Sequence, residues 1–361
     1  MATRARLHDL AVAAIEPLTD DSVAVTFAVP PELADAYAHS AGQHLSVLSP
    51  QVGDGVRRSY SICTPAGSGE LRIGVKLLPD GGFSAYAADK LAVGDVLEVL
   101  TPVGRFGPRS LDADAEHSYV LVAAGSGITP VLSIAGTVLA AEPRSRVTLL
   151  YVNRFARSVM FAEEVADLKD RYPGRFQVLH LLSREPGAGE LLSGRLDRER
   201  MGRLLDTLVP PEGVDGWFLC GPHAMVIDLR DLLVERDVDP AIVHTELFHA
   251  DETPPAVPVS APMAEAEGEG AEVEIMMDGR RSTLRVPRDG MPVLDAALAV
   301  RADAPFSCRG GVCGTCRAKL LEGTVRMDHR YALEDDEVED GFVLTCQSHP
   351  TSDRVVLDYD A

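Results

Sequence analysis

Near its C-terminus the chain reads Cys308-Arg309-Gly310-Gly311-Val312-Cys313-Gly314-Thr315-Cys316, and a fourth cysteine, Cys346, follows further on. The Cys-x4-Cys-x2-Cys spacing with a distant fourth cysteine is typical of four thiolates that hold a [2Fe–2S] cluster. Gly310, Gly311 and Gly314 allow the sharp backbone turns that bring three thiols around one centre. We therefore predict a cluster with four ligands: Cys308, Cys313, Cys316 and Cys346.

Two other uses of these cysteines stay open. A structural zinc site usually shows two Cys-x2-Cys pairs, which this triplet fits poorly. Disulfides are disfavoured because the chain has only six cysteines, and Met1–Leu10 lacks the apolar segment of a signal peptide. We expect a cytoplasmic protein, because a reducing compartment keeps thiols free for a cluster.

The composition argues against some classes of function. With 361 residues the chain has room for two or three domains, and 46% hydrophobic with 25% charged residues is ordinary for a globular protein. No apolar run is long enough to span a bilayer, so we expect no membrane segment. A net charge of −21 argues against nucleic-acid binding through a basic surface. The acidity keeps the protein soluble or steers it to a basic protein partner, and both explanations stay open.

The N-terminal part, residues 1–112, contains short strands separated by turn residues such as Gly53-Asp54-Gly55 and Gly94-Asp95. This spacing predicts a small antiparallel β-barrel. The expected strands are Leu7–Ile15, Ser22–Val29, Gln43–Leu48, Arg57–Cys63, Leu71–Lys76 and Val96–Leu100.

The middle part, residues 113–249, alternates apolar strands with helices, which predicts a doubly wound parallel α/β sheet. The expected strands are Tyr119–Ala124, Val147–Val152, Phe176–Leu182, Trp217–Cys220 and Ile242–Leu247. Helices are expected to Leu139, over Phe161–Arg171, and near Asp197–Leu208 and Pro222–Glu235.

A stretch rich in Pro, Ala and Glu, residues 250–271, predicts an extended linker because it cannot bury a core. The last part, residues 272–361, opens with a predicted hairpin of Glu272–Asp278 and Ser282–Val286 joined by Asp278-Gly279. A helix over Val293–Ala302 precedes the cysteine loop. Short strands are expected at Lys319–Leu321, Thr324–Met327, Phe342–Thr345 and Val355–Leu357.

Two stretches of the first part carry groups suited to a phosphate or a flat ring. In Arg58-Ser59-Tyr60-Ser61 an arginine can hold a phosphate, a tyrosine can lie against a ring and a serine can bond a ring heteroatom. Gly81-Gly82-Phe83-Ser84 offers bare backbone and a hydroxyl at a helix start. By itself, the first is equally compatible with an ordinary surface strand, and the Gly-Gly pair of the second more often marks a turn.

Three stretches of the second part fall at the carboxyl ends of predicted strands, where open parallel sheets bind ligands. Gly125-Ser126-Gly127-Ile128-Thr129-Pro130 lies between a strand and a helix, as a pyrophosphate loop does. Cys220-Gly221-Pro222 could bring a thiol to a nicotinamide, or be a buried cysteine before a turn. Ser183-Arg184, with Arg195, could take a 2′-phosphate and so favour NADPH over NADH, or be a solvated loop.

Together these motifs resemble the ferredoxin–NADP reductase superfamily over residues from Leu7 to Phe248. The resemblance implies that Arg58 meets the FAD pyrophosphate, that Tyr60 and Ser61 face the isoalloxazine, and that Gly82-Phe83-Ser84 forms a second FAD-phosphate loop. Gly125, Ser126, Gly127 and Thr129, with Gly221 and Pro222, match its nicotinamide-nucleotide motifs. Glu246-Leu247-Phe248 resembles its terminal acidic–x–aromatic segment, so Phe248 would cover the flavin. Ser61, Cys220 and Glu246 would form the region of contact between nicotinamide and flavin.

The C-terminal part resembles plant-type ferredoxin, which implies an α+β β-grasp domain. The order flavin, nucleotide, ferredoxin is shared by reductase components of bacterial multicomponent oxygenases. More narrowly, three stretches resemble the family of phenylacetyl-CoA epoxidase reductase subunits, and reductases of 3-ketosteroid 9α-hydroxylases have a similar layout. The stretches are Gly310–Lys319, Tyr331–Glu334 and Val343–Gln347.

The resemblance implies that NADPH gives a hydride to FAD and that electrons pass singly to the [2Fe–2S] cluster and on to an oxygenase, expected to be a di-iron enzyme. An electron-carrier protein that uses only its ferredoxin part is the alternative of another class, and the intact Arg58, Tyr60 and Cys220 argue against it. A flavin reductase would not need the four cysteines. A nitric-oxide dioxygenase would need a haem domain before Leu7.

Overall fold

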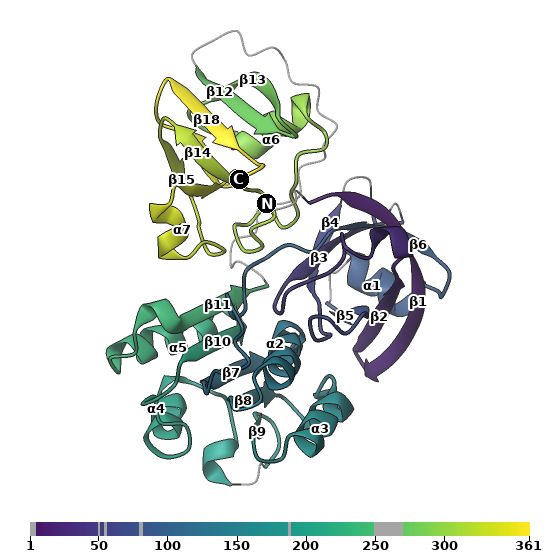
Figure 1. The fold of residues 1–361 in the computed structure, drawn as a ribbon, viewed down its shortest axis with the longest axis vertical. Helices are drawn as coiled ribbons and strands as arrows, with labels where there is room; N and C mark the ends of the chain where they lie inside the picture. The colour runs from purple at the N-terminus through teal and green to yellow at the C-terminus, as the bar shows by residue number, and fades with distance from the viewer. Residues whose placement is uncertain (1–4, 50, 54–55, 79–81, 187–188, 249–269) are drawn as a thin grey trace.

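The computed structural model describes residues 5–49, 51–53, 56–78, 82–186, 189–248 and 270–361. The chain forms three parts in succession, each built on its own main sheet (Figure 1). The predicted linker lies mostly outside the described residues, and its last two residues, Gly270 and Ala271, already belong to a strand.

The first part is an antiparallel β-barrel, as predicted. Within the described residues its strands follow the order β4-β3-β6-β1-β2-β5, and an antiparallel bridge between Ile62 and Ile73 joins the two ends. Buried apolar side chains, among them Leu10, Val25 and Leu97, fill the interior beside helix α1. The elements are β1 (Leu7–Thr19), β2 (Ser22–Ala28), β3 (His44–Leu48), β4 (Arg57–Ser61), β5 (Leu71–Lys76), α1 (Gly82–Asp89) and β6 (Val96–Leu100).

The second part is a parallel sheet of order β11-β10-β7-β8-β9, which confirms the doubly wound prediction. Alternate residues of β7 belong to two different cores: Leu121 packs with α2 and α3, and Val120 packs with α4 and α5. Helices therefore cover both faces of the sheet. The elements are β7 (Ser118–Ala124), α2 (Ile128–Ala141), β8 (Arg146–Asn153), α3 (Ala162–Arg171), β9 (Phe176–Leu182), α4 (Arg198–Thr207), β10 (Gly216–Gly221), α5 (His223–Glu235) and β11 (Val243–Leu247).

The third part has a mixed sheet of order β13-β12-β18-β14-β16, with α6 packed on it. The predicted hairpin is present: β12 and β13 pair antiparallel, and alternate residues of β12 from Ala271 to Met277 are buried. The pair β15–β17 lies beside it. The elements are β12 (Gly270–Met277), β13 (Arg280–Pro287), α6 (Val293–Val300), β14 (Arg317–Glu322), β15 (Val325–Met327), α7 (Asp335–Glu339), β16 (Phe342–Leu344), β17 (Ser348–Pro350) and β18 (Arg354–Asp358).

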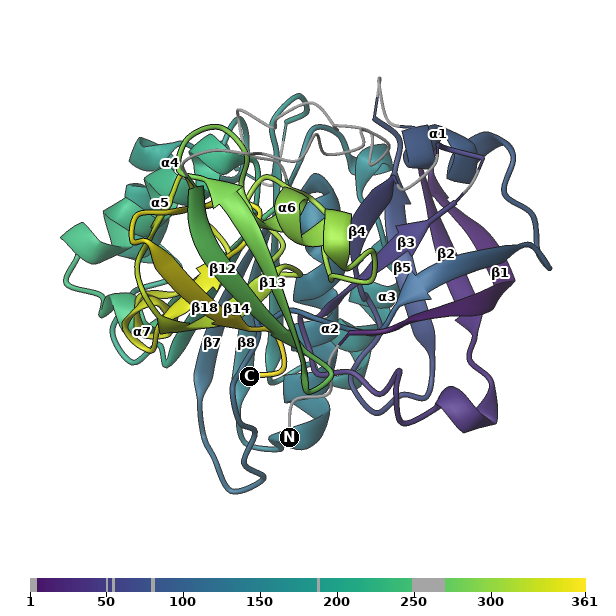
Figure 2. The ribbon, with the colours of Figure 1, turned by 90° about the horizontal axis from the view of Figure 1, so that it is seen from above.

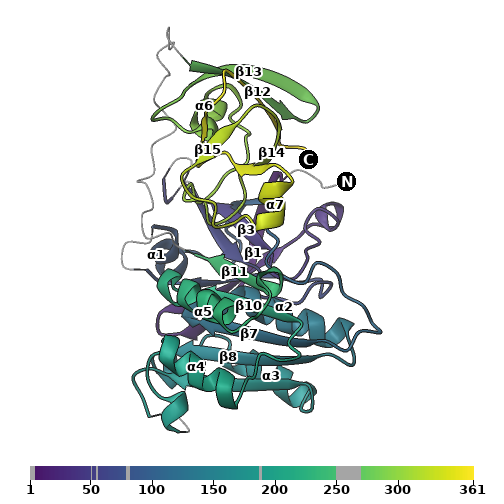
Figure 3. The same cartoon turned by 90° about the vertical axis from the view of Figure 1, so that its left-hand side faces the viewer.

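The third part lies over the junction between the first two. Seen from above, its strands lie mainly over the parallel sheet, and α6 lies beside β4 of the barrel (Figure 2). From the side, α7 faces down toward β11 and β3 (Figure 3). Helix α7 and strand β17 were not among the predicted elements, because each has too few residues to show a period.

Candidate functional site

The four predicted cluster cysteines lie together as two pairs. Cys308 lies beside Cys313, and Cys316 lies beside Cys346, with all four thiols close enough to interact electrostatically. All six cysteines of the chain are free thiols. Among the described His, Cys, Asp and Glu side chains, no group of three is placed to hold a single metal ion. Two pairs of thiols, rather than one tetrad, suit a two-iron cluster, in which each iron takes two cysteines.

The loop between these cysteines depends on left-handed backbone. Gly311 and Gly314 have φ of 74° and 66°, and Arg309 has φ of 56°. Gly310 is not in this region, so only two of the three predicted glycines make the turn. A Cβ on Gly311 would also meet Gln347 Cγ at 3.1 Å and the His329 carbonyl oxygen at 3.2 Å. The loop therefore packs against Gln347, directly after Cys346, and against His329.

Acid–base chemistry in the loop favours thiolate at Cys313. The hydrogen bond from Cys308 lowers the pKa of Cys313 well below its usual range, and bonds from His44 and Thr315 act in the same direction against the effect of burial. Thiolate is the form that ligates iron. Neighbouring thiols and burial raise the pKa of Cys308 and Cys346 well above its usual range, so the fit to a [2Fe–2S] cluster rests on the four sulfurs lying together.

Strand β4 presents its predicted flavin residues on two faces. Arg58 and Tyr60 point to one side, and Ser61 shares the other side with Arg57 and Ser59. Arg58 is exposed, with Nη1 donating to the Arg57 carbonyl oxygen at 2.9 Å. The Tyr60 ring packs on Phe83, with centroids 5.3 Å apart. An exposed guanidinium beside a ring supported from behind is suited to a nucleotide's phosphate and flat ring.

The second predicted phosphate loop lies at the start of α1. The Ser84 hydroxyl accepts from the Leu78 amide at 3.1 Å, and a Cβ on Gly82 would come within 2.8 Å of Val52. Phe83 is only 2% exposed and belongs to the barrel core. Only the backbone of Phe83 can therefore serve the predicted cofactor site, because the Phe83 side chain packs behind Tyr60.

The predicted nucleotide loops meet at the carboxyl edge of the parallel sheet. A Cβ on Gly127 would lie 2.3 Å from the Cys220 carbonyl oxygen, so the two loops touch through bare backbone. Gly125 has φ of 54° and open space where its Cβ would be. Thr129 is buried and bonds the Ser126 carbonyl oxygen at 3.0 Å. The half-exposed Gly125 and Ser126 are therefore the accessible part of the loop, at the N-terminal end of α2.

The three residues predicted to act between nicotinamide and flavin are brought together from two domains. Ser61 Oγ donates to Glu246 Oε2 at 3.2 Å, and Glu246 is the register partner of Cys220 on the adjacent strand. Burial and the nearby Glu246 charge raise the pKa of Cys220 well above its usual range, so its thiol stays neutral. Phe248 packs against the core that contains Cys220.

The predicted 2′-phosphate residues follow β9 at the same edge. The Ser183 and Arg184 amides donate to the carbonyl oxygens of Asn153 and Arg154 at 2.9 Å each, which ties the loop after β9 to the end of β8. The side chains of Arg184 and Arg195 are exposed and form no ion pair with the described residues. Arg154, which no sequence motif marks, is exposed beside them.

Three known protein families match the three parts of the chain. The family profile "Oxidoreductase FAD-binding domain" matches residues 9–107, "Oxidoreductase NAD-binding domain" matches 121–231 and "2Fe-2S iron-sulfur cluster binding domain" matches 275–351. The chain is also 41% identical, over 98% of both chains, to a subunit of 1,2-phenylacetyl-CoA epoxidase from Escherichia coli (strain K12). This chain belongs to the iron–sulfur flavoprotein reductases.

Two further likenesses support that membership. The ferredoxin reductase component of 3-ketosteroid-9-alpha-monooxygenase from Rhodococcus rhodochrous is 35% identical over 97% of this reductase and 96% of its own length. The structure of phthalate dioxygenase reductase matches with a TM-score of 0.59 and 27% identity over 98% of both chains. The reductase is thus an NAD(P)H-dependent oxidoreductase with FAD and a [2Fe–2S] cluster as cofactors.

Sequence reasoning missed the residues that join the cysteine loop to the barrel. Arg57 Nη1 donates to the Phe306 carbonyl oxygen at 3.1 Å, and its guanidinium lies 4.0 Å from the centre of the Phe306 ring. Ser59 Oγ donates to Ser307 Oγ at 2.8 Å. His44 Nε2 lies 3.3 Å from Thr315 Oγ1. These contacts place the loop of the reductase directly beside the strand that carries Ser61.

A second set of interdomain contacts is ionic and surrounds α7. Arg105 Nη1 pairs with Glu337 at 2.8 Å, and Arg109 Nη1 pairs with Asp336 at 2.7 Å. Arg109 also pairs with Glu334, whose other oxygen lies 2.6 Å from His244 Nδ1. We call this group of five charged residues and one histidine the ionic belt: Arg105, Arg109, His244, Glu334, Asp336 and Glu337. No local motif marks it in the sequence.

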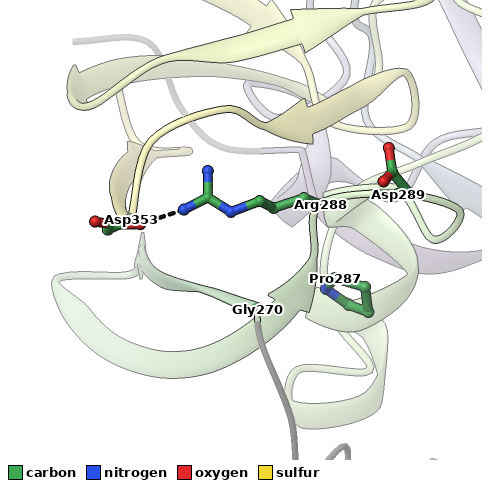
Figure 4. A pocket seen from close by; sticks show the side chains of 5 residues that line it. All are labelled: Gly270, Pro287, Arg288, Asp289 and Asp353. Carbon is green, nitrogen blue, oxygen red and sulfur yellow. Dashed lines mark hydrogen bonds and ion pairs between the residues drawn. The ribbon is translucent and has the colours of Figure 1, made fainter.

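One surface hollow lies outside this site. It is formed by Gly270, Pro287, Arg288, Asp289 and Asp353 at the rim of the C-terminal sheet, and Figure 4 shows Arg288 reaching across it to an ion pair with Asp353. It is open, and its cation is already paired, so we assign it no ligand. No helix among the described residues is long and apolar enough to cross a membrane.

Proposed function

We propose that this reductase takes electrons from NADPH and delivers them through FAD and the [2Fe–2S] cluster to the di-iron oxygenase of a phenylacetyl-CoA epoxidase. One observation carries the electron route: the cysteine loop is docked against β4, so that Ser59 contacts Ser307 while Ser61 contacts Glu246 of the nucleotide part. The three cofactor regions therefore meet at one strand. The choice of oxygenase is supported by the 41% identity over nearly the whole of both chains.

In this proposal the barrel holds FAD with residues from β4 and α1. Arg58 binds the pyrophosphate, together with the backbone of Gly82 and Phe83 and the Ser84 hydroxyl. Tyr60 lies against the isoalloxazine, and Ser61 faces the same ring while its hydroxyl proton is donated to Glu246. Phe248 covers the other face of the ring and moves aside when nicotinamide stacks there. FAD, when bound, supplies the change from hydride to single-electron chemistry.

The parallel sheet holds the dinucleotide at its carboxyl edge. The amides of Gly125 and Ser126 bind the pyrophosphate, supported by the buried Gly127 and Thr129, and Gly221 and Pro222 shape the wall opposite. The cations Arg184 and Arg195, with Ser183, bind the 2′-phosphate, which is the basis for proposing NADPH. Cys220 acts as a neutral thiol that positions the nicotinamide, because burial prevents its ionisation.

The cluster is held by two cysteine pairs, Cys308 with Cys313 and Cys316 with Cys346. Replacement Cys313→Ser tests this assignment together with the order of carriers. We expect the variant to lose reduction of the oxygenase and to keep NADPH oxidation with ferricyanide, which can draw electrons from the flavin. Loss of the ferricyanide reaction in a folded, FAD-loaded variant would contradict the proposed order.

Coupled turnover decides between the two candidate oxygenases. The purified reductase is mixed with NADPH and either the oxygenase of phenylacetyl-CoA epoxidase or that of 3-ketosteroid 9α-hydroxylase, and product is measured in each. We expect coupling with the epoxidase. Efficient coupling with the steroid enzyme alone would favour the second candidate, which rests on the 35% identity to its reductase.

A further inference from the structure

His44 is a buried histidine that lies between the flavin strand and the cysteine loop. It is the first residue of β3 and only 3% exposed. Its main chain is fixed on both sides, with its amide donating to the Val103 carbonyl oxygen at 2.8 Å and its carbonyl accepting from the Val103 amide at 3.0 Å. The ring is thus held by a rigid sheet and not by a loop.

The register of β3 and β4 places His44 next to Ser61. The two residues are directly opposed in the antiparallel pair, so their side chains project from the same face. Side chains of such a pair have Cβ atoms about 4.5–5.5 Å apart. The imidazole is therefore an immediate neighbour of the hydroxyl that faces the flavin.

The other side of the ring meets the cysteine loop. Its Nε2 lies 3.3 Å from Thr315 Oγ1, two residues from Cys313, and the Cys313 side chain is a close neighbour of the ring. The opposite edge is closed by bare backbone, because a Cβ on Gly104 would come within 2.9 Å of Nδ1. The ring is consequently wedged in one orientation, with a nitrogen directed at the loop.

The chemistry of a cluster ligand decides which group donates. A cysteine thiolate bound to iron has no proton, so it can only accept a hydrogen bond. The imidazole must then supply the N–H. Hydrogen bonds to the sulfurs of an iron–sulfur cluster raise its reduction potential, because they stabilise the extra negative charge of the reduced state.

We propose that His44 is a positioning residue that donates an imidazole N–H to the Cys313 sulfur, raising the reduction potential of the cluster and holding it beside the flavin strand. This inference rests on the proposed ligand role of Cys313. It adds a residue of the barrel to the surroundings of a cofactor carried by a different part of the chain.

Pulsed EPR on the full-length, cofactor-loaded protein tests the bond directly. The reduced cluster is compared in wild type grown with ¹⁵N-histidine and in His44→Gln labelled in the same way. We expect a ¹⁵N hyperfine coupling in wild type that disappears in His44→Gln. A ¹⁵N coupling that is the same in wild type and His44→Gln comes from another histidine and overturns the proposal, as does an ordinary [2Fe–2S] signal without ¹⁵N coupling in wild type. Absence of any [2Fe–2S] signal would instead overturn the ligand assignment, and the His44 proposal with it.

Potentiometry distinguishes the effect of the His44 hydrogen bond on the reduction potential of the cluster from the effect of side-chain packing. We expect His44→Leu, which has no donor, to shift the cluster potential to more negative values by more than it shifts the flavin potential. His44→Gln, which keeps an N–H, should restore part of the shift. His8→Leu is the control, since His8 lies in the same barrel against Tyr37 and away from the loop. Equal cluster potentials in wild type and in both His44 variants would contradict the proposal.

Discussion

Glu246 is the ionisable residue at the junction of the flavin and nucleotide parts. Burial raises the pKa of its carboxyl to about 7, although the charge of His44 and the hydrogen bond from Ser61 act to lower it. The group therefore changes charge in the neutral range, where most carboxylates are fully ionised. A residue of this kind at a predicted hydride-transfer site controls the local charge during the reaction.

We predict that the rate of NADPH oxidation with ferricyanide rises with pH through about 7. Above this pKa the carboxylate is ionised, and its charge stabilises the positive charge that nicotinamide acquires as it gives up hydride. Glu246→Gln should remove the inflection and lower the rate at high pH about tenfold, which corresponds to roughly 1.4 kcal/mol in the barrier.

Ser61→Ala gives an independent check of the same assignment. Loss of the Ser61 hydrogen bond, which lowers the pKa of Glu246, should move the inflection to higher pH by on the order of one unit. An inflection that stays in place in both variants would show that another group titrates.

Gly127 supports a prediction about close packing. The added methyl of Gly127→Ala would lie 2.3 Å from the Cys220 carbonyl oxygen, and backbone cannot easily move away. We expect the variant to lose about 1–3 kcal/mol of unfolding free energy in urea titration. Gly174→Ala is the control, because a Cβ there meets nothing within 4 Å. Equal stabilities of the two variants would contradict the observed contact between the loops.

Among the elements, most strands were predicted to within one or two residues, whereas α7 and β17 were not predicted. Strands β5, β6 and β9 match their predicted ranges, and α3 differs by one residue, because alternation and helical period extend over their whole length. Strand β1 runs four residues beyond its predicted end, since pairing with β2 continues to Thr19. Pairing with β2 in the folded protein therefore makes β1 longer than the local sequence pattern predicts.

The cysteine loop supports a prediction at the scale of the element. Gly311→Ala should reduce the iron and sulfide content and the visible absorption of the purified protein, because φ of 74° strains an alanine and its Cβ would meet Gln347 and His329. Gly279→Ala is the matched control in the β12–β13 turn, with φ of 66° but open space around the Cβ. We expect the control to keep its cluster. Equal loss of iron and sulfide in both variants would mean that backbone strain alone, and not contact of the added Cβ with Gln347 and His329, removes the cluster.

At the scale of the whole molecule, docking of the ferredoxin part combines a buried contact with an exposed one. The buried contact is formed by Arg57 with Phe306 and by Ser59 with Ser307. In the ionic belt, the pairs of Arg109 with Glu334 and Asp336 are exposed on both sides, whereas Arg105, which is 58% exposed, pairs with Glu337, whose side chain is only 6% exposed. Exposed ion pairs contribute about 0.2–1 kcal/mol each and are weakened by salt.

We therefore predict that salt slows transfer of electrons from flavin to cluster within the protein. Stopped-flow reduction by NADPH should show a cluster phase that slows several-fold between about 0.1 M and 1 M salt, over which the screening length falls from about 10 Å to about 3 Å. The double variant Arg105→Gln/Arg109→Gln should be slow at low salt and nearly independent of salt.

Arg198→Gln is the control for the ionic belt. Its partner, Glu235, lies within the same nucleotide part, so this ion pair does not join two domains. We expect the control to behave like wild type, and the flavin phase to be equal in all three proteins. A cluster phase that is independent of salt in wild type would contradict a docking role for the belt.

Local sequence patterns were enough to establish the three parts, their kinds of sheet and the cysteine spacing, because strand alternation, helical period, turn residues and ligand spacing are all contained within short stretches of chain. Other features appeared only once the whole chain was folded. Phe83 supports Tyr60 from the core, and the cysteine loop lies on β4. Folding also brought His44 to Cys313, and Glu246 to Ser61. Such contacts join residues that are far apart in the chain, and they depend on surface shape and charge that no local pattern records.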